Sequence, residues 1–414
     1  MSLQLFFRPR APAGWTPSIP LLLLVLLFLA GCSGTVRQPL PADVHQQATV
    51  LGRNDLRYWG DAVPESRMSW FYESRKLATG YEGIINREHN YLVLSGGGEN
   101  GAYGAGVLVG WSEVGSRPEF TIVTGISTGA LTAPFAFLGV DYDPMLTEVY
   151  TTLGTSNIFE LRSVFKLAGK ESLADTAPMQ RTLESYVDDT MVAALAREYR
   201  RGRRLQIGTT NLDAGRPVVW DITRIAATGH PEAKNLIHKV LLASAALPGL
   251  FPPVYINVEA PDGKRYDEMH VDGGATAQMF FYPANVDWED VARRFGVRGA
   301  PTVYVIRNSK VRPRYEPVKP RMSAIGGRTV SSLIRTQGIG DFYRILALAE
   351  RDGLELQISW IPEEAVSDVL SDEPFDPDFM RALFEYGYQR VSEGDAWTDA
   401  HEAMETINRS ATTP

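Results

Sequence analysis

The chain has 414 residues, of which 44% are hydrophobic and 22% charged, with 37 Gly and 26 Pro. These proportions are typical of a folded globular protein and exclude collagen-like, coiled-coil and mostly disordered chains. The formal net charge is −8, but residues 361–414 alone hold 13 acidic and 3 basic side chains. The rest of the chain is therefore near neutral, which argues against a protein that binds nucleic acid.

The amino terminus has the pattern of a targeting segment. Two arginines, Arg8 and Arg10, precede an unbroken apolar run at 21–30, which is too short to span a bilayer and predicts the core of a signal peptide. The only cysteine, Cys32, follows this run, so no intramolecular disulfide, cysteine-based zinc site or iron–sulfur cluster can form.

The segment Leu29-Ala30-Gly31-Cys32 resembles a bacterial lipoprotein signal, in which cleavage leaves the cysteine first in the mature chain and its thiol receives a lipid. The resemblance implies a signal peptide at 1–31, lipid attachment at Cys32, and the bacterial cell envelope as location. The following Ser33 favours the outer membrane or periplasmic face over the inner membrane. The alternative is a secretory signal cut elsewhere, with Cys32 incidental.

Beyond a tether and lead-in at 32–89, predicted strands alternate with predicted helices. Apolar runs predict strands at 91–94, 120–124, 205–209, 217–222, 269–272 and 301–306. Apolar spacing and small residues predict helices at 101–111, 128–138, 232–246, 323–348 and 376–391. This alternation predicts an α/β fold with a largely parallel sheet that helices cover on both faces.

A G-x-S-x-G motif, Gly125 to Gly129, lies between a predicted strand and a predicted helix. In that setting the motif predicts a nucleophile elbow, a strained turn that raises the Ser127 hydroxyl above the sheet. The helix that starts at Thr128 directs its free N–H groups at the same spot, where they favour an oxyanion. The alternative interpretation is a plain tight strand-to-helix turn.

A cluster of three glycines, Gly96, Gly97 and Gly98, also lies where a strand ends and a helix begins. Backbone amides without a neighbouring Cβ can bind an anion, and three interpretations remain open: an acyl-transfer oxyanion, a nucleotide phosphate, or close helix–strand packing. The phosphate interpretation lacks the Gly-Lys-Ser/Thr ending of a P-loop. The oxyanion is favoured.

The serine needs a base, and Asp272 is the favoured candidate. It lies at the end of a predicted strand, directly before Gly273 and Gly274, and a carboxylate of raised pKa can accept a serine proton. His270 is a competing base on the same face of the strand, but one strand repeat away. The favoured interpretation of His270 is a buried structural histidine.

Three motifs, taken in order, resemble the patatin-like phospholipases, which use a Ser-Asp dyad. They are Gly96-Gly97-Gly98-x-x-Gly101, Gly125-x-Ser127-x-Gly129 and Asp272-Gly273-Gly274. The resemblance implies a three-layer α/β/α fold with Ser127 as nucleophile and Asp272 as base. It implies oxyanion donors around Gly97 and Gly98, a lipid or phospholipid acyl ester as substrate, and no metal or organic cofactor. With the rest of the glycine cluster and the start of the helix, the expected oxyanion hole is Gly96, Gly97, Gly98 and Thr128.

The resemblance divides the chain into a catalytic core at 90–285, a C-terminal α/β extension of the same domain at 286–395 and an acidic tail at 396–414.

One position departs from the family. Members commonly carry Lys or Arg just before the last glycine of the loop, where this chain has Asn100 after Glu99. The departure weakens the expectation of phospholipid as substrate more than that of ester hydrolysis. Two basic clusters, near 197–204 and 307–321, are candidates for headgroup contact.

The sequence thus predicts a lipid acyl hydrolase of phospholipase A or esterase type, which works through an acyl-enzyme and is anchored to the envelope. Two alternatives stay open. One is an acyltransferase or an esterase for non-phospholipid substrates. The other is a catalytically silent envelope binding protein. Head-group class, oligomeric state and protein partners are not predicted.

Overall fold

The computed structural model describes residues 37–62, 81–163, 170–284, 286–312, 315, 317–363, 365 and 373–412. The expected signal peptide at 1–31 and lipid attachment site at Cys32 lie outside these residues. Within the described ranges, no helix is both long enough and apolar enough to cross a bilayer.

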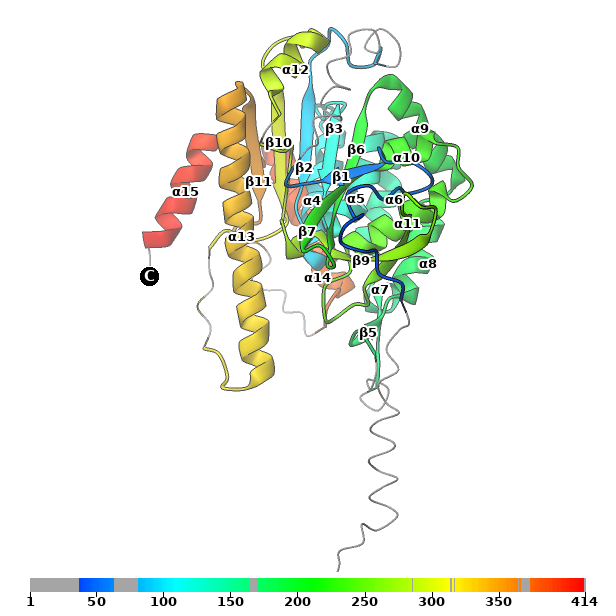
Figure 1. Ribbon diagram of the computed structural model, residues 1–414. Helices are drawn as coiled ribbons and strands as arrows, with labels where there is room; N and C mark the ends of the chain where they lie inside the picture. The colour runs from blue at the N-terminus through cyan, green and yellow to red at the C-terminus, as the bar shows by residue number, and fades with distance from the viewer. Residues whose placement is uncertain are drawn as a thin grey trace, which may run out of the picture.

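A mixed sheet forms the middle of the molecule, with helices on both sides (Figure 1). Its five central strands are parallel and lie in the order β6 (Arg204–Asn211), β3 (Ile122–Gly125), β2 (Asn90–Leu94), β10 (Thr302–Arg307) and β11 (Glu355–Trp360). Because parallel strands end at the same edge, the loops after β2, β3 and β10 meet there.

Antiparallel strands complete both margins of the sheet. On one side, β7 (Arg216–Asp221) pairs with β6 and with β1 (Arg57–Trp59), and β12 (Thr398–Asp399) pairs with β11 on the other. The end of β9 (Arg265–Asp272) also pairs with β6, and β8 (Val254–Glu259) pairs with β9. Through β9, Asp272 reaches the edge where β3 ends.

Side chains on the central strands alternate between two apolar cores, as expected of a sheet covered on both faces. Leu92 and Leu94 belong to the core formed with α4 (Gly101–Glu113) and α14 (Pro377–Glu393). Tyr91 and Val93 belong to the core formed with α12 (Trp288–Phe295), α13 (Met322–Asp352) and α15 (Ala400–Thr412). The expected three-layer α/β/α fold is confirmed, and its sheet is parallel in the centre and antiparallel at the margins.

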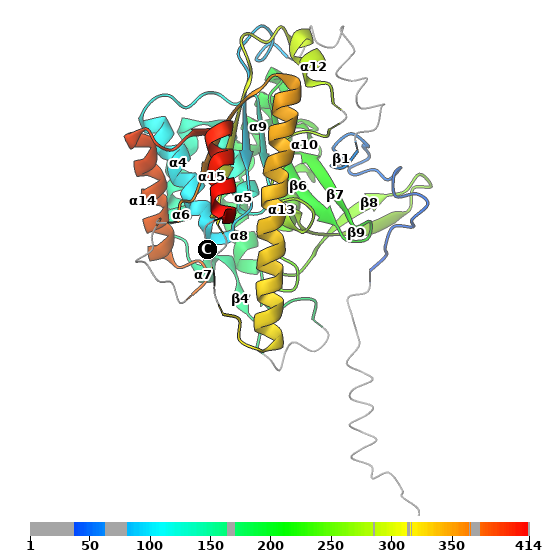
Figure 2. The same ribbon diagram turned by 90° about the vertical axis from the view of Figure 1, so that its left-hand side faces the viewer.

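The remaining helices lie mostly around the α4 core. They are α5 (Thr128–Leu138), α6 (Asp143–Thr151), α7 (Thr155–Ile158), α8 (Ala177–Tyr186), α9 (Asp189–Arg201), α10 (Ile222–Ala227) and α11 (Ala233–Ser244). A short hairpin of β4 (Glu160–Leu161) and β5 (Ala174–Asp175) lies apart from the main sheet. Figure 2 shows α13 and α15 in front of the sheet, with α4 and α14 beside them.

Candidate active site

Ser127 lies at a sharp turn between β3 and α5. Its φ of 55° is a left-handed value that a non-glycine residue rarely adopts, and the structure around it holds it there. Gly129 makes this turn possible, since a Cβ at that position would lie 2.5 Å from the Leu94 carbonyl oxygen. The strand, strained serine and helix thus have the geometry of a nucleophile elbow.

Asp272 is the last residue of β9 and is 4% exposed. Its carboxylate accepts a hydrogen bond from the Gly274 N–H at 2.7 Å and another from the Ser127 hydroxyl. Burial raises the pKa of Asp272 to about 6, although both hydrogen bonds oppose this change. The carboxyl is therefore mostly ionised at neutral pH, and can accept a proton from the serine.

His270 does not contact this pair. Its ring is fully buried, with Nδ1 2.9 Å from the Thr209 hydroxyl and Nε2 3.1 Å from a carboxylate oxygen of Glu268. Glu268 also forms an ion pair with Arg57. Burial lowers the pKa of His270. Both ring nitrogens are thus engaged in a buried network, which fits the structural interpretation of His270.

The glycine loop lies directly against the serine. A Cβ at Gly96 would be 3.2 Å from the Ser127 Cβ. The Gly96 N–H donates to the Gln278 carbonyl oxygen at 3.1 Å, so we leave it out of the candidate oxyanion donors. Within the described part of the chain, the N–H groups of Gly97, Gly98 and Thr128 donate to no protein acceptor. These three amides are available to a ligand.

At the other motif glycines, segments of the backbone approach one another closely. A Cβ would lie within 3.0 Å of another atom at each of Gly101, Gly125, Gly129, Gly273 and Gly274. At Gly125, Gly129 and Gly273 the nearest atom is a backbone carbonyl oxygen, which leaves no room for a side chain, so these glycines fix how the elbow fits against the neighbouring strand and loop.

Three side chains that sequence reasoning did not assign hold the site in place. The Ser244 hydroxyl accepts from the Ser127 N–H at 3.0 Å and donates to the Gly208 carbonyl at 2.7 Å. The Asn308 amide binds the Ser95 carbonyl at 3.0 Å, before the glycine loop. Asp341 accepts from the Gln278 N–H at 2.6 Å. Ser244 is the last residue of α11 and Asn308 directly follows β10, so position at the end of an element was a signal for these two, whereas Asp341 lies well inside α13.

Glu99, the acidic residue in the glycine loop, has a structural partner. Its carboxylate accepts a hydrogen bond from the Phe375 N–H, in the segment that leads into α14. Asn100 donates its N–H to the Gly97 carbonyl at 3.2 Å. The loop is thus held by a carboxylate contact and a turn.

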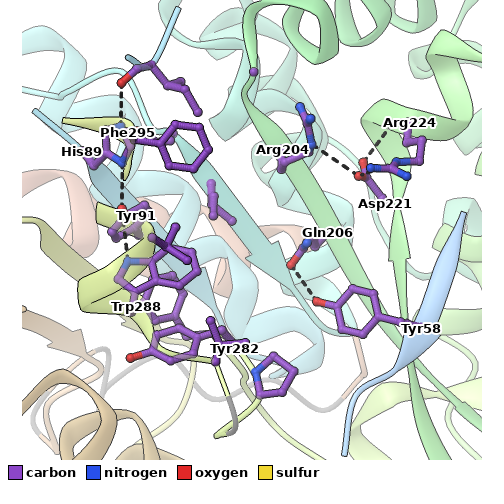
Figure 3. Close-up of a pocket in the computed structure, with 18 of the residues that line it drawn as sticks. Tyr58, His89, Tyr91, Arg204, Gln206, Asp221, Arg224, Tyr282, Trp288 and Phe295 are labelled. Atoms are coloured by element: carbon purple, nitrogen blue, oxygen red, sulfur yellow. Dashed lines mark hydrogen bonds and ion pairs between the residues drawn. The ribbon is translucent and has the colours of Figure 1, made fainter. Parts of the chain in front are cut away.

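A cavity of about 320 Å³ lies elsewhere in the fold (Figure 3). Its wall includes Tyr91, Ile122 and Arg204, at the amino-terminal ends of β2, β3 and β6. Aromatic rings dominate one side, and on the other Arg204 and Arg224 pair with Asp221. Ser127 and Asp272 do not line it. The cavity is therefore at the opposite end of the parallel strands from the serine.

No group of three or more His, Cys, Asp or Glu side chains in the described ranges is arranged to hold a metal ion.

Comparison with known proteins finds one matching family model and two similar solved structures. A protein-family comparison matches residues 92–285 to Patatin, described as patatin-like phospholipase. Among solved structures, the chain is similar to VipD from Legionella pneumophila, with 13% identity and a TM-score of 0.34 over 75% of this chain and 68% of VipD. It is also similar to the type III effector protein ExoU, with 11% identity and a TM-score of 0.23 over 75% of this chain and 53% of ExoU. No curated protein gives a significant match. The family match covers residues 92–285, which is less than half of the chain, and shows that this part is similar to the patatin-like phospholipases.

Proposed function

We propose that the protein hydrolyses acyl esters of membrane lipids, with Ser127 as nucleophile and Asp272 as general base. One observation carries the proposal: a buried carboxylate with a pKa of about 6 accepts a hydrogen bond from a serine hydroxyl held at a strained elbow. A base whose pKa is near the working pH is largely ionised there, yet still binds a proton strongly enough to remove one from the serine.

In the proposed reaction, Ser127 Oγ attacks the ester carbonyl carbon while its proton passes to Asp272. The amides of Gly97, Gly98 and Thr128 donate to the oxyanion that forms. The intermediate then expels the alcohol, which takes the proton from Asp272, and the acyl group stays on Ser127. Water next attacks this acyl-enzyme as Asp272 removes its proton, and the fatty acid leaves as the proton returns to Ser127.

We further propose that the protein works at the bacterial envelope, held there by a lipid on Cys32. Support comes from the apolar run at 21–30 that ends at the only cysteine of the chain. Burial of acyl chains contributes about 0.8 kcal/mol per methylene, so that two or more chains give stable anchoring. Replacing Cys32 by Ser should abolish metabolic labelling of the protein with a fatty acid. Labelling that persists would contradict this assignment.

A fluorophosphonate probe tests the nucleophile, because it reacts covalently with activated serines. We expect labelling of the full chain, its loss in Ser127→Ala, and strong reduction in Asp272→Asn. Ser185→Ala is the matched control, since Ser185 is an exposed serine on α8. Labelling that survives Ser127→Ala would contradict the proposed nucleophile, and no labelling of the wild type would favour a catalytically silent binding protein.

Product analysis separates hydrolysis from acyl transfer. We expect purified protein with acyl-labelled phospholipids and glycerides to release free fatty acid, at a rate that does not depend on added alcohol. Labelled ester that accumulates at the expense of fatty acid when an alcohol acceptor is added would identify an acyltransferase instead.

A further inference from the structure

Arg307 is a buried cation at the carboxyl edge of the sheet. It is the last residue of β10 and is 2% exposed. Val303 and Val305 of the same strand belong to the core formed with α13, so the side chain of Arg307 lies on that face as well. A Cβ at Gly338, in α13, would be 3.6 Å from Arg307 Nη2. The guanidinium is therefore enclosed between the end of β10 and the middle of α13.

Most of this guanidinium has no acceptor. Its Nε donates to the Ser309 hydroxyl at 2.8 Å, but within the described ranges neither Nη1 nor Nη2 forms a hydrogen bond or an ion pair. Arg203, in the other basic cluster, is also buried but donates to Glu198 and to two backbone carbonyl oxygens. Because buried polar groups are nearly always hydrogen-bonded, a free pair of donors in such a place indicates a ligand site.

The shape of the free donors indicates which ligand. Nη1 and Nη2 form the edge of a guanidinium that binds a phosphate or a carboxylate through two parallel hydrogen bonds. Arg307 thus presents the part of its side chain that is suited to an oxyanion with two acceptor oxygens.

Positive charge accumulates at this place. Arg335 lies one turn before Gly338 on the same face of α13. Burial, and next the charge of Arg335, lowers the pKa of Arg307 to about 10, so Arg307 stays charged at neutral pH beside a second arginine. Asp341, one turn after Gly338, opposes this change but lies beyond ion-pair distance of Arg307 and pairs with Arg344 at 3.6 Å. A bound anion would relieve the repulsion between the two arginines.

One side chain, Gln278, connects this place with the proposed catalytic serine. A Cβ at Gly338 would be 3.5 Å from the Gln278 Cβ and Cγ. A Cβ at Gly96 would be 3.2 Å from Gln278 Oε1 and equally far from the Ser127 Cβ. In a glycerophospholipid, one glycerol carries both the acyl esters and the phosphate. A phosphate subsite therefore has to lie near the serine, as Arg307 does.

The glycine loop supplies no cation of its own, since Glu99 is its only charged residue from 95 to 101. We propose that Arg307 and Arg335 bind the phosphate of a glycerophospholipid whose acyl ester lies at Ser127. Nη1 and Nη2 of Arg307 donate to two phosphate oxygens. Arg335, which is long and half-exposed, turns aside to admit the headgroup and adds its charge from the solvent side.

This inference rests on the proposed function, which assigns lipid esters to the serine, so its first test measures binding and not catalysis. Isothermal titration calorimetry is carried out on the full chain carrying Ser127→Ala, which cannot consume a substrate. The ligands are dihexanoyl phosphatidylglycerol, dihexanoylglycerol and inorganic phosphate. Both lipids are kept below the concentrations at which they aggregate, so that binding reports on single molecules.

We expect the phospholipid to bind at least ~10-fold more tightly than the glyceride, because it gains two charge-assisted hydrogen bonds. Arg307→Gln should abolish this difference, and Arg335→Gln should reduce it at least ~3-fold. Because Arg335 is half-exposed, its replacement tests the site even if Arg307→Gln does not fold. Arg298→Gln is the matched control, an exposed arginine just before the other end of β10, and should keep the full difference.

A second test uses the wild-type serine. The ratio of kcat/KM for dihexanoyl phosphatidylglycerol to that for dihexanoylglycerol should fall at least ~10-fold in Arg307→Gln, chiefly through the KM of the phospholipid. An arginine with only a structural role would affect both substrates alike and leave this ratio unchanged, which would contradict the proposal. A wild type that hydrolyses neither substrate would count against the proposed function, and the binding measurement would then decide on the phosphate subsite.

Three binding results would overturn the subsite. The first is equal affinity of the Ser127→Ala chain for the phospholipid and the glyceride. The second is a preference for the phospholipid that survives in folded Arg307→Gln. The third is inorganic phosphate that binds through Arg307 and is not displaced by the phospholipid, which would show that the ligand is free phosphate and not a lipid headgroup.

Discussion

The backbone N–H of Ser127 donates to the hydroxyl of Ser244 at 3.0 Å, and that hydroxyl donates to the Gly208 carbonyl at 2.7 Å. The strained elbow is thus tied to the end of α11 and, through it, to β6. Since this N–H is engaged, the proposed oxyanion donors are the amides of Gly97, Gly98 and Thr128.

Ser244→Ala should therefore lower both stability and activity. It leaves the Ser127 N–H and the Gly208 carbonyl without a partner in a fully buried place, at a cost of about 1–3 kcal/mol. The elbow should relax, so we expect kcat on a soluble ester to fall more than KM rises. Urea unfolding and steady-state kinetics measure the two effects. An unchanged kcat in the folded variant would contradict the positioning role of Ser244.

The raised pKa of Asp272 predicts how the activity depends on pH. Because the base has to be ionised and its pKa is about 6, kcat/KM on a soluble ester should fall tenfold per pH unit below pH 6 and level off above it. A pH–rate profile of the wild type checks this. A profile that stays flat down to pH 5 would exclude Asp272 as the base.

The same group predicts the pH dependence of stability. Folding raises the pKa of Asp272 from 3.8 to about 6, so its favourable contribution is complete below pH 3.8 and is lost as pH rises through 6. The buried charge should then cost about 3 kcal/mol at neutral pH. Asp272→Asn should thus be inactive, yet more stable than the wild type at pH 8 and by a smaller margin at pH 4. Urea unfolding at both pH values measures this, and an equal difference at both would contradict it.

Gly97→Ala tests the glycine loop as an oxyanion site. A Cβ at Gly97 would lie 2.2 Å from the Asn308 carbonyl oxygen, so the loop has to move. Loss of one oxyanion donor typically lowers kcat by ~10²–10³. Gly340→Ala is the control, because a Cβ there meets nothing within 4 Å, and it should keep full activity on a soluble ester. Comparable kcat values for the two variants would contradict the assignment.

Glu268→Gln tests the network around His270. Glu268 is almost completely buried and binds both Arg57 and His270, so its removal leaves a buried guanidinium without a counter-charge. We expect a loss of about 3–5 kcal/mol in the free energy of unfolding. Asp262→Asn, which removes an exposed ion pair with Lys264, should cause no measurable change. Equal stability of the two variants would contradict a structural role for this network.

Local pattern predicted the central elements well. The strand at 91–94 and the helix at 128–138 agree with β2 and α5 almost to the residue, because an apolar run and a glycine turn define their ends. By contrast, β8 and β11 were not predicted. In β8, burial alternates and the sequence includes Asn257 and Glu259, so its strand character depends on pairing with β9.

In the candidate site, too, local sequence reveals some residues and only tertiary structure reveals others. Sequence motifs make Ser127, Asp272 and the loop glycines recognisable, because each motif is local. The supporting residues Ser244, Asn308 and Asp341 come from distant segments, and only the fold brings their polar atoms to the elbow. The difference between Gly96 and Gly97 as amide donors also depends on tertiary structure, since it is the Gln278 carbonyl that occupies one of them.

The pairing of β9 with β6 has a consequence for when the protein becomes active. Asp272 reaches Ser127 only through three residue pairs between these strands, formed by segments far apart in the chain. A newly made or unfolded chain carries the serine without its acid and without the assembled amides. If the proposed export to the envelope precedes folding, the proposed lipid cleavage would begin only at the destination, and the membranes of the producing compartment would be spared.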